Sequence, residues 1–86
     1  MEIKGEIYEH FPIFGSSNIA SIAHNMKEGD DAKMVVFFKH GAAYLYYKVS
    51  VDTCNLIKND EVSVGKKFIE LVKKNPERYP FEALPA

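Results

Sequence analysis

Two neighbouring segments in the middle of the chain are apolar at nearly every position, and this pattern constrains the fold most strongly. Residues 34–38 read MVVFF and residues 43–49 read AYLYYKV, with Lys39-His40-Gly41 between them. Runs of β-branched and aromatic residues around a short glycine-containing loop predict an antiparallel hairpin. Because strand side chains alternate, one face should carry Met34, Val36, Phe38, Tyr44 and Tyr46, and the other Val35, Phe37, Leu45 and Tyr47. A sheet with one solvated face alternates apolar with polar residues, so both faces of this hairpin need a cover.

Two C-terminal helices can supply one cover. Asp52 is a candidate cap for a short helix that points Leu56 and Ile57 inward and ends at Asn59-Asp60. Ser63 can cap a second helix, in which Phe68, Leu71 and Val72 form an apolar stripe at spacings of three and four. The charged residues of this helix would lie on its solvent side: Lys66, Lys67, Glu70, Lys73 and Lys74. The sequence predicts that this helix stops before Pro76.

The sequence leaves open which of two sources covers the second face of the hairpin. Residues 1–15 read as an extended or irregular lead-in that could fold over it with the apolar side chains Ile3, Ile7, Phe11, Ile13 and Phe14. A second copy of the chain, in a homodimer, would serve equally, since exposed apolar patches mark interfaces. Residues 16–26 are compatible with either a helix or a strand. The proline-rich segment after Tyr79 is expected to dock without regular structure.

These elements predict an α+β fold: a short antiparallel meander of about three strands, followed by two helices packed on one face of the sheet. The expected organisation is a lead-in at residues 1–16, an α+β domain at residues 17–80 and a tail at residues 81–86. A chain of 86 residues is the size of one small domain.

Composition narrows the class of protein. Hydrophobic residues make up 47% of the chain and charged residues 27%, as in globular proteins. No apolar run approaches the roughly 20 residues that span a bilayer, so no membrane association is expected. Glu2, Glu6 and Glu9 stand where a secretion signal would be basic and apolar. Cys54 is the single cysteine, which fits a reducing compartment. We therefore expect a cytoplasmic protein.

The hairpin resembles a known family motif. Phe38, Gly41, Tyr44, Tyr46 and Val49 fall in the spacing F-x-x-G-x-x-Y-x-Y-x-x-V of the KTSC domain, which is named for the C-terminus of some lysyl-tRNA synthetases. The segment from Ser63 to Ile69 is similar to that family's S-x-G-x-[YF]-F motif, Tyr79 to its closing tyrosine, and Ser17 with Ile19 to its opening residues. The resemblance covers roughly residues 17–80. It implies an α+β unit, found also as small stand-alone proteins of bacteria and their viruses, with RNA as a suggested ligand.

Catalytic and metal-binding motifs are not evident. His10, His24 and His40 lie 14 and 16 residues apart, whereas zinc ligands come in close local pairs. Nucleophile-elbow, Walker and Rossmann patterns are missing from the sequence. Cys54 reads as a small core residue. The sequence predicts no enzyme, no cofactor and no metal.

Three sets of residues could bind a partner. Exposed aromatic side chains that stack on bases, flanked by cations that contact phosphates, are typical of an RNA site. The candidate residues for such a site are Tyr44, Tyr46, Tyr47, Lys39, His40 and Lys48. The competing interpretation packs Tyr44 and Tyr46 under the helices. Ser63, Lys66 and Lys67 at the start of the second helix could hold an anion. A plain N-cap at Ser63 with solvent-exposed lysines would account for these residues equally well. The second sheet face could bind another protein: Val35, Phe37, Leu45 and Tyr47.

The leading hypothesis is a non-enzymatic module that binds RNA or another phosphate-bearing ligand. The alternative is a small interaction or inhibitor protein, of phage or mobile-element origin, whose apolar sheet face contacts itself or a host protein. A formal net charge of −1 is low for a general nucleic-acid binder. Basic residues are nevertheless concentrated locally, because residues 33–51 hold three lysines and no acid.

Overall fold

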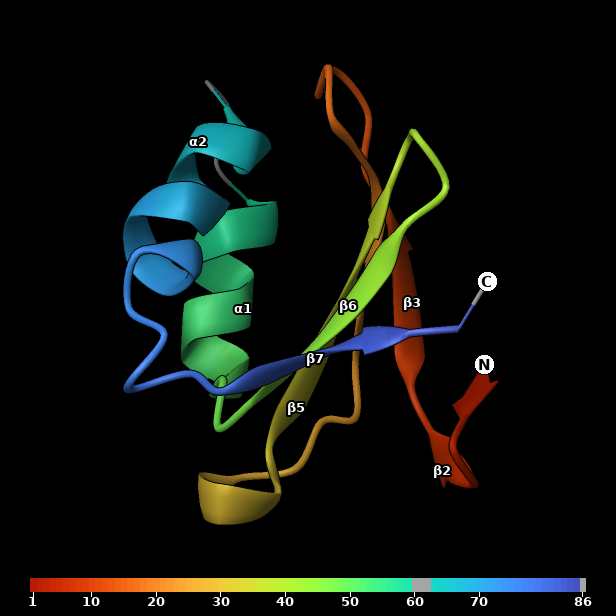
Figure 1. Ribbon diagram of the computed structural model, residues 1–86, viewed down its shortest axis with the longest axis vertical. Coiled ribbons are helices and arrows are strands. Elements are labelled where there is room, and N and C mark those ends of the chain that lie inside the picture. Colours follow the sequence, from red (N-terminus) through yellow and green to blue (C-terminus); the bar gives the residue numbers. More distant parts are fainter. Residues whose placement is uncertain (60–62, 86) are drawn as a thin grey trace.

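The hairpin forms the centre of a five-stranded antiparallel sheet in the computed structural model, which describes residues 1–59 and 63–85 (Figure 1). The strands follow one another in chain order: β3 (Glu9–Pro12), β4 (Ile19–His24), β5 (Lys33–Phe38), β6 (Ala43–Tyr47) and β7 (Phe81–Leu84). A separate two-stranded hairpin precedes them, made of β1 (Glu2–Ile3) and β2 (Glu6–Ile7). A 3₁₀ turn, η1 (Gly29–Asp31), joins β4 to β5.

The β5–β6 hairpin has the expected register. Val35 lies opposite Leu45 and Val36 opposite Tyr44. The turn at residues 39–41 closes with a hydrogen bond of 2.9 Å from the Phe38 N–H to the Ala42 carbonyl. Gly41 has a φ of 103°, a conformation that residues with a side chain rarely adopt. The predicted hairpin is therefore confirmed.

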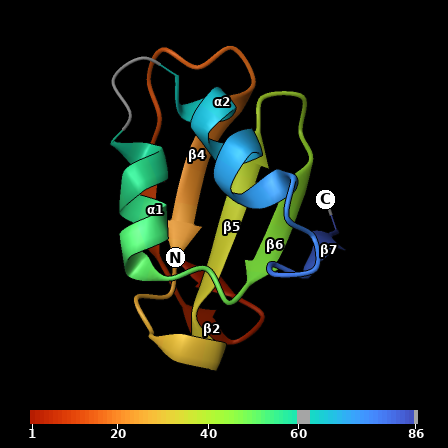
Figure 2. The ribbon, with the colours of Figure 1, turned by 90° about the vertical axis from the view of Figure 1, so that its left-hand side faces the viewer.

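The helices lie against one face of the sheet, in front of β4, β5 and β6 in Figure 2. They are α1 (Val51–Lys58), α2 (Val64–Phe68) and a π-helical turn, η2 (Ile69–Lys73), that continues α2. Phe68 and Val72 are buried with Ile57 against Met34 and Val36 of β5. Phe68 and Val72 of the predicted apolar stripe thus face the core, and Leu71 is partly buried beside them. Within the described residues, no helix is long and apolar enough to cross a membrane.

The two helix caps fulfil the prediction only in part. Ser63 caps α2 as expected, because its hydroxyl accepts the Lys66 N–H at 3.1 Å. The cap of α1 is Ser50, whose hydroxyl accepts the Thr53 N–H at 3.1 Å, and Asp52 lies in the first turn instead. Leu56 is 61% exposed while Ile57 is buried, because adjacent residues of an α-helix point about 100° apart and only one of the two faces the core. The predictions for Asp52 and for an inward Leu56 were wrong. The helix ends at Lys58, and Asp60 lies outside the described residues.

The N-terminal segment covers the second face of the sheet. Tyr8 is 2% exposed and packs with Ala23, Val35 and Leu45, and Ile3 of β1 lies beside them. Figure 1 shows this hairpin on the side of the sheet opposite to the helices. The other apolar side chains of the segment lie elsewhere: Ile7 and Phe14 are exposed, Ile13 packs toward the helix side, and Phe11 lies under the Lys58 ammonium. The chain's own lead-in is therefore the cover.

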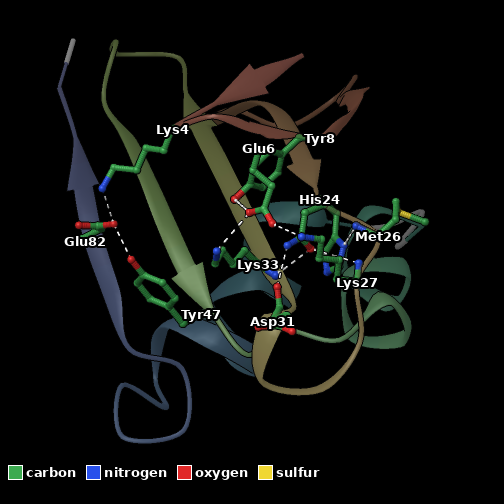
Figure 3. Close-up of polar contacts among 11 residues, drawn as sticks. Lys4, Glu6, Tyr8, His24, Met26, Lys27, Asp31, Lys33, Tyr47 and Glu82 are labelled. Carbon is green, nitrogen blue, oxygen red and sulfur yellow. Dashed lines mark hydrogen bonds and ion pairs between the residues drawn. The ribbon is translucent and has the colours of Figure 1, made fainter.

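Polar contacts fix this cover to the sheet (Figure 3). The Glu6 carboxylate accepts hydrogen bonds from Lys27 at 2.7 Å and from Lys33 at 3.1 Å. The Glu82 carboxylate of β7 accepts Lys4 at 2.7 Å and the Tyr47 hydroxyl at 2.6 Å. The two carboxylates thus join the small hairpin to β4–β5 on one side and β6–β7 on the other.

Two expectations about the extent of the sheet were wrong. The meander has five strands rather than about three, because residues 19–24 form β4 and both ends of the chain add a strand. The segment after Tyr79 is regular rather than irregular: β7 pairs with β6, from Ala43 opposite Leu84 to Tyr46 opposite Phe81. Pro80 and Pro85 flank this strand at the sheet edge, where a missing N–H breaks no ladder bond.

Leu45 on the second face tests whether that face is covered, and the exposed Leu56 of α1 is its control. Leu45 is 2% exposed and Leu56 is 61% exposed. We expect Leu45→Ala to lower the free energy of unfolding by about 2–5 kcal/mol, because it leaves a cavity under Tyr8. Leu56→Ala should change it by about 0.5 kcal/mol or less. Urea denaturation of both variants measures the difference, and equal losses would contradict a covered second face.

A pH titration tests the ionic attachment. Hydrogen bonds from Lys27, with a smaller contribution from Lys33, lower the pKa of Glu6 to about 2. A carboxyl whose pKa is lower in the folded state stabilises the fold above its unfolded pKa of about 4.3. That stabilisation disappears as the pH falls from there toward 2.

We therefore expect Glu6→Gln to cost about 0.5–1 kcal/mol at pH 7 and to flatten the decline in stability between pH 4.5 and 2. Thermal unfolding followed by circular dichroism across this range measures both effects. Glu2→Gln, which neutralises an exposed carboxylate of the same hairpin, is the matched control. Parallel curves for Glu6→Gln and the unmodified protein would reject the attachment.

Candidate functional site

A cavity of about 450 Å³ opens between the β5–β6 hairpin, β7 and the end of η2. Its walls are mainly aromatic, and we call it the aromatic groove. Six rings line it, together with Val72, Lys73 and Pro76: Phe38, His40, Tyr44, Tyr46, Tyr79 and Phe81. The sheet contributes through the alternation of its strands, which sends Tyr44 and Tyr46 of β6 and Phe81 of β7 to the helix side.

The rings of the groove are held in contact with one another. Phe38 lies edge to face with Tyr44 at 5.8 Å between centroids, and Tyr44 with Phe81 at 6.1 Å. The His40 ring stacks on Phe38 at 5.5 Å with an interplanar angle of 10°. Such pairs add about 0.5–1.5 kcal/mol each beyond burial. The groove wall is thus preorganised, while Phe81 remains 54% exposed and offers a free ring surface.

The charge of the groove is positive. Lys73 supplies a positive charge beside the His40 ring, and among residues 1–59 and 63–85 no carboxylate lines the groove. Burial, with a smaller effect from the neighbouring Tyr44, raises the pKa of the Tyr46 hydroxyl, so Tyr46 is neutral at physiological pH. Arg78 lies over the Tyr79 ring, with its guanidinium carbon 5.3 Å from the centroid. A ligand with a flat apolar part and a negative charge would match these walls.

The predicted RNA-binding residues divide between two faces. The structure brings Tyr44, Tyr46 and His40 together in the groove, although Tyr46 is only 5% exposed and packs against Phe68. The helices do cover these tyrosines, as the competing interpretation expected, yet they leave an opening beside them. Lys39 lies exposed in the adjacent turn.

Tyr47 and Lys48 lie away from this group. Tyr47 points to the second face, where its hydroxyl donates to Glu82. Lys48 follows the other end of β6 and is exposed there. The five residues of β6 separate it from the hairpin turn by about 17 Å at roughly 3.4 Å per residue.

The predicted anion-binding residues also separate. Ser63 and Lys66 line a second cavity of about 430 Å³, beside the β3–β4 loop. Lys67 instead lines a shallow depression with Asp52 and Asn55 of α1. The Ser63 hydroxyl is engaged as the helix cap, so the plain capping role describes its geometry.

The predicted interface residues lie under the N-terminal hairpin. Val35 is fully buried, Leu45 is 2% exposed, and Phe37 and Tyr47 are partly buried beside them. A partner could reach this face only after displacement of Tyr8 and Ile3. The interface at this face stays a prediction that the single chain does not test.

The histidines have different surroundings. His24 is fully buried, with its Nε2 2.6 Å from the Val49 carbonyl and its Nδ1 accepting the Met26 N–H at 2.8 Å. These two contacts identify the neutral tautomer with the proton on Nε2. The hydrogen bond from Nε2 to Val49 joins β4 to the segment just before α1. Among residues 1–59 and 63–85, no three His, Cys, Asp or Glu side chains gather as a metal site would require.

Several groove residues were not among the predicted site residues. Phe38 and Tyr79 were assigned only to the sheet and to the family motif, Lys73 to the solvent face, and Phe81 to an irregular tail. The aromatic content of the segment after Tyr79 was the one available signal. Only the pairing of β7 with β6 places Phe81 beside Tyr44.

Comparison of the chain with protein-family models, with curated proteins and with solved structures finds no match. The resemblance to the KTSC domain therefore still depends on the hairpin and helix residues quoted above.

Cys54 provides a test of whether this chain carries a reactive thiol. It is 1% exposed in the helix-side core, and burial raises the pKa of its thiol to about 11. The thiolate is the reactive form, so we expect iodoacetamide at pH 8 to modify Cys54 at least tenfold more slowly in the native protein than in urea. Mass spectrometry of timed samples measures both rates. Equal rates would show that Cys54 is accessible.

Proposed function

We propose that this protein is a non-enzymatic binding module for single-stranded RNA, and that the aromatic groove is its binding site. The observation that supports the proposal most directly is the composition of the groove wall: six rings with Lys73 and no carboxylate. Aromatic side chains hold single-stranded nucleic acid by stacking on its bases, and nearby cations meet its phosphates. We also propose, from the hairpin motif, that the chain is a KTSC-like domain acting in the cytoplasm.

The arrangement of the rings supports base binding rather than a purely structural role. His40 and Phe81 are exposed in the groove while Phe38 and Tyr44 hold them from behind. A base entering the groove would contact rings that are already ordered, so little conformational entropy is lost on binding. The stacked pair His40–Phe38 shows the flat packing that a base would extend.

Charge supports a phosphate-bearing ligand. Most acidic side chains of the described residues lie elsewhere, in the N-terminal strands and at Glu28–Asp31, and Glu77 and Glu82, which neighbour the groove in the sequence, do not line it. The groove is thus locally basic in a chain with a net charge of −1. A local basic surface gives weaker and more site-directed binding than a uniformly basic protein would show.

Fluorescence anisotropy with a labelled mixed-sequence RNA octamer at low salt tests the proposal. We expect binding that Phe81→Ala weakens about 5- to 100-fold, because removal of a stacking ring costs about 1–3 kcal/mol. Lys73→Gln should reduce the slope of log K against log salt by about 0.7, the loss of one single-strand phosphate contact. Both side chains are exposed, so both variants should fold.

Two control variants remove comparable groups on other surfaces. Ile7→Ala shortens an exposed apolar side chain of β2, and Lys48→Asn removes a cation at a position whose φ of 63° asparagine tolerates. Neither should change the affinity. The proposal is wrong if the octamer does not bind at low salt, or if Phe81→Ala and Lys73→Gln behave like the controls.

A further inference from the structure

Three cavities adjoin along one side of the helix that runs through α2 and η2. A small cavity of about 180 Å³ lies between the aromatic groove and the cavity beside the β3–β4 loop. It shares Phe38, His40 and Lys73 with the aromatic groove. It shares three other residues with the cavity beside the loop: Asn18, Gly65 and Ile69. Because neighbouring cavities share lining residues, the three form a row along the helix, which we call the channel.

The two ends of this channel differ in chemistry. One end is the aromatic groove. At the other, polar side chains from the β3–β4 loop face two lysines and one glutamate of the helix: Ser17, Asn18, Lys66, Glu70 and Lys74. Gly65 lines both the middle and the polar cavity, and a Cβ built at this position would come no closer than an ordinary contact of 3.6 Å to the Ser16 hydroxyl. Figure 2 shows the helix running beside the β3–β4 loop and the β5–β6 turn, the two segments that line the channel.

We propose that the whole channel binds one short segment of single-stranded RNA, with bases stacked at the aromatic end and phosphates held by Lys66 and Lys74 at the polar end. This inference rests on the proposed function and specifies its ligand as an oligonucleotide rather than a single nucleotide. Three lysines against one glutamate give the channel a positive lining, which matches the repeated charge of a nucleic-acid backbone.

The length of the channel sets the length of the segment. The polar cavity alone is lined by residues from Ser63 to Lys74, and the ten residues of α2 and η2 between them rise by at most about 15 Å at the 1.5 Å per residue of an α-helix. About four stacked nucleotides span that distance at roughly 3.4 Å each. Four nucleotides is the lower end of the range that a small single-strand-binding domain covers.

Competition with unlabelled oligonucleotides measures this length. Uridine monophosphate and oligouridines of two, four and eight nucleotides displace a labelled oligouridine octamer from the full chain. We expect the tetramer to compete at least tenfold better than the monophosphate, and the octamer to gain little beyond the tetramer. A monophosphate that competes as well as the tetramer overturns the extended channel.

Variants at the polar end separate this inference from the proposed function. We expect Lys66→Gln and Lys74→Gln each to reduce the salt slope for the tetramer by about 0.7 and to leave the monophosphate's affinity within twofold. Lys48→Asn is the charge-matched control, and circular dichroism confirms that each variant folds. If the tetramer binds and Phe81→Ala weakens it while both lysine variants do not, the channel is wrong and the groove stands.

An acidic peptide provides the remaining comparison. A decamer of alternating glutamate and phenylalanine carries negative charge and flat rings without phosphates. We expect it to compete at least tenfold more weakly than the tetramer. If a labelled form of the peptide binds directly and no oligouridine binds, both the RNA function and the channel's RNA ligand are overturned.

Discussion

The structure depends on a central pair of strands that must be shielded from water on both faces. Val35 and Leu45 point to one side of the sheet and Val36 and Tyr46 to the other, and all four are buried. Helices are the cover on one side. On the other, a two-stranded hairpin and Tyr8 from the N-terminal segment do the same work. The carboxylates of Glu6 and Glu82 then attach that small cover to the sheet through ion pairs with Lys4, Lys27 and Lys33.

This two-sided burial also explains where a ligand could bind. The N-terminal hairpin closes the second face, while the helix layer is narrower than the sheet and leaves the aromatic groove beside β6 and β7. Aromatic side chains serve both purposes at this edge: Tyr46 is part of the core, and Phe81, directly opposite it on β7, is exposed. The same rings that complete the core therefore form the wall of the groove.

Much of the fold could be predicted from the sequence where local patterns decide. The hairpin at residues 34–47, the division of its side chains between faces and the Ser63 cap follow from alternation and capping chemistry. The errors arose where two local signals compete. Ser50 and Asp52 are both residue types that cap helices well, and in the structure Ser50 is the cap while Asp52 lies in the first turn. Pro80 and Pro85 argue against a strand, yet β7 forms because at a sheet edge no bond is lost.

The sequence by itself determined that this chain contains a hairpin apolar on both sides, since the period of two is a property of the backbone. It also determined that some cover is needed there. Only the tertiary structure decided which segment covers the second face and which distant residues share the groove. Tyr8 and Leu45 are 37 positions apart, as are Tyr44 and Phe81, and contacts at such separation depend on the pairing of whole strands rather than on any local preference.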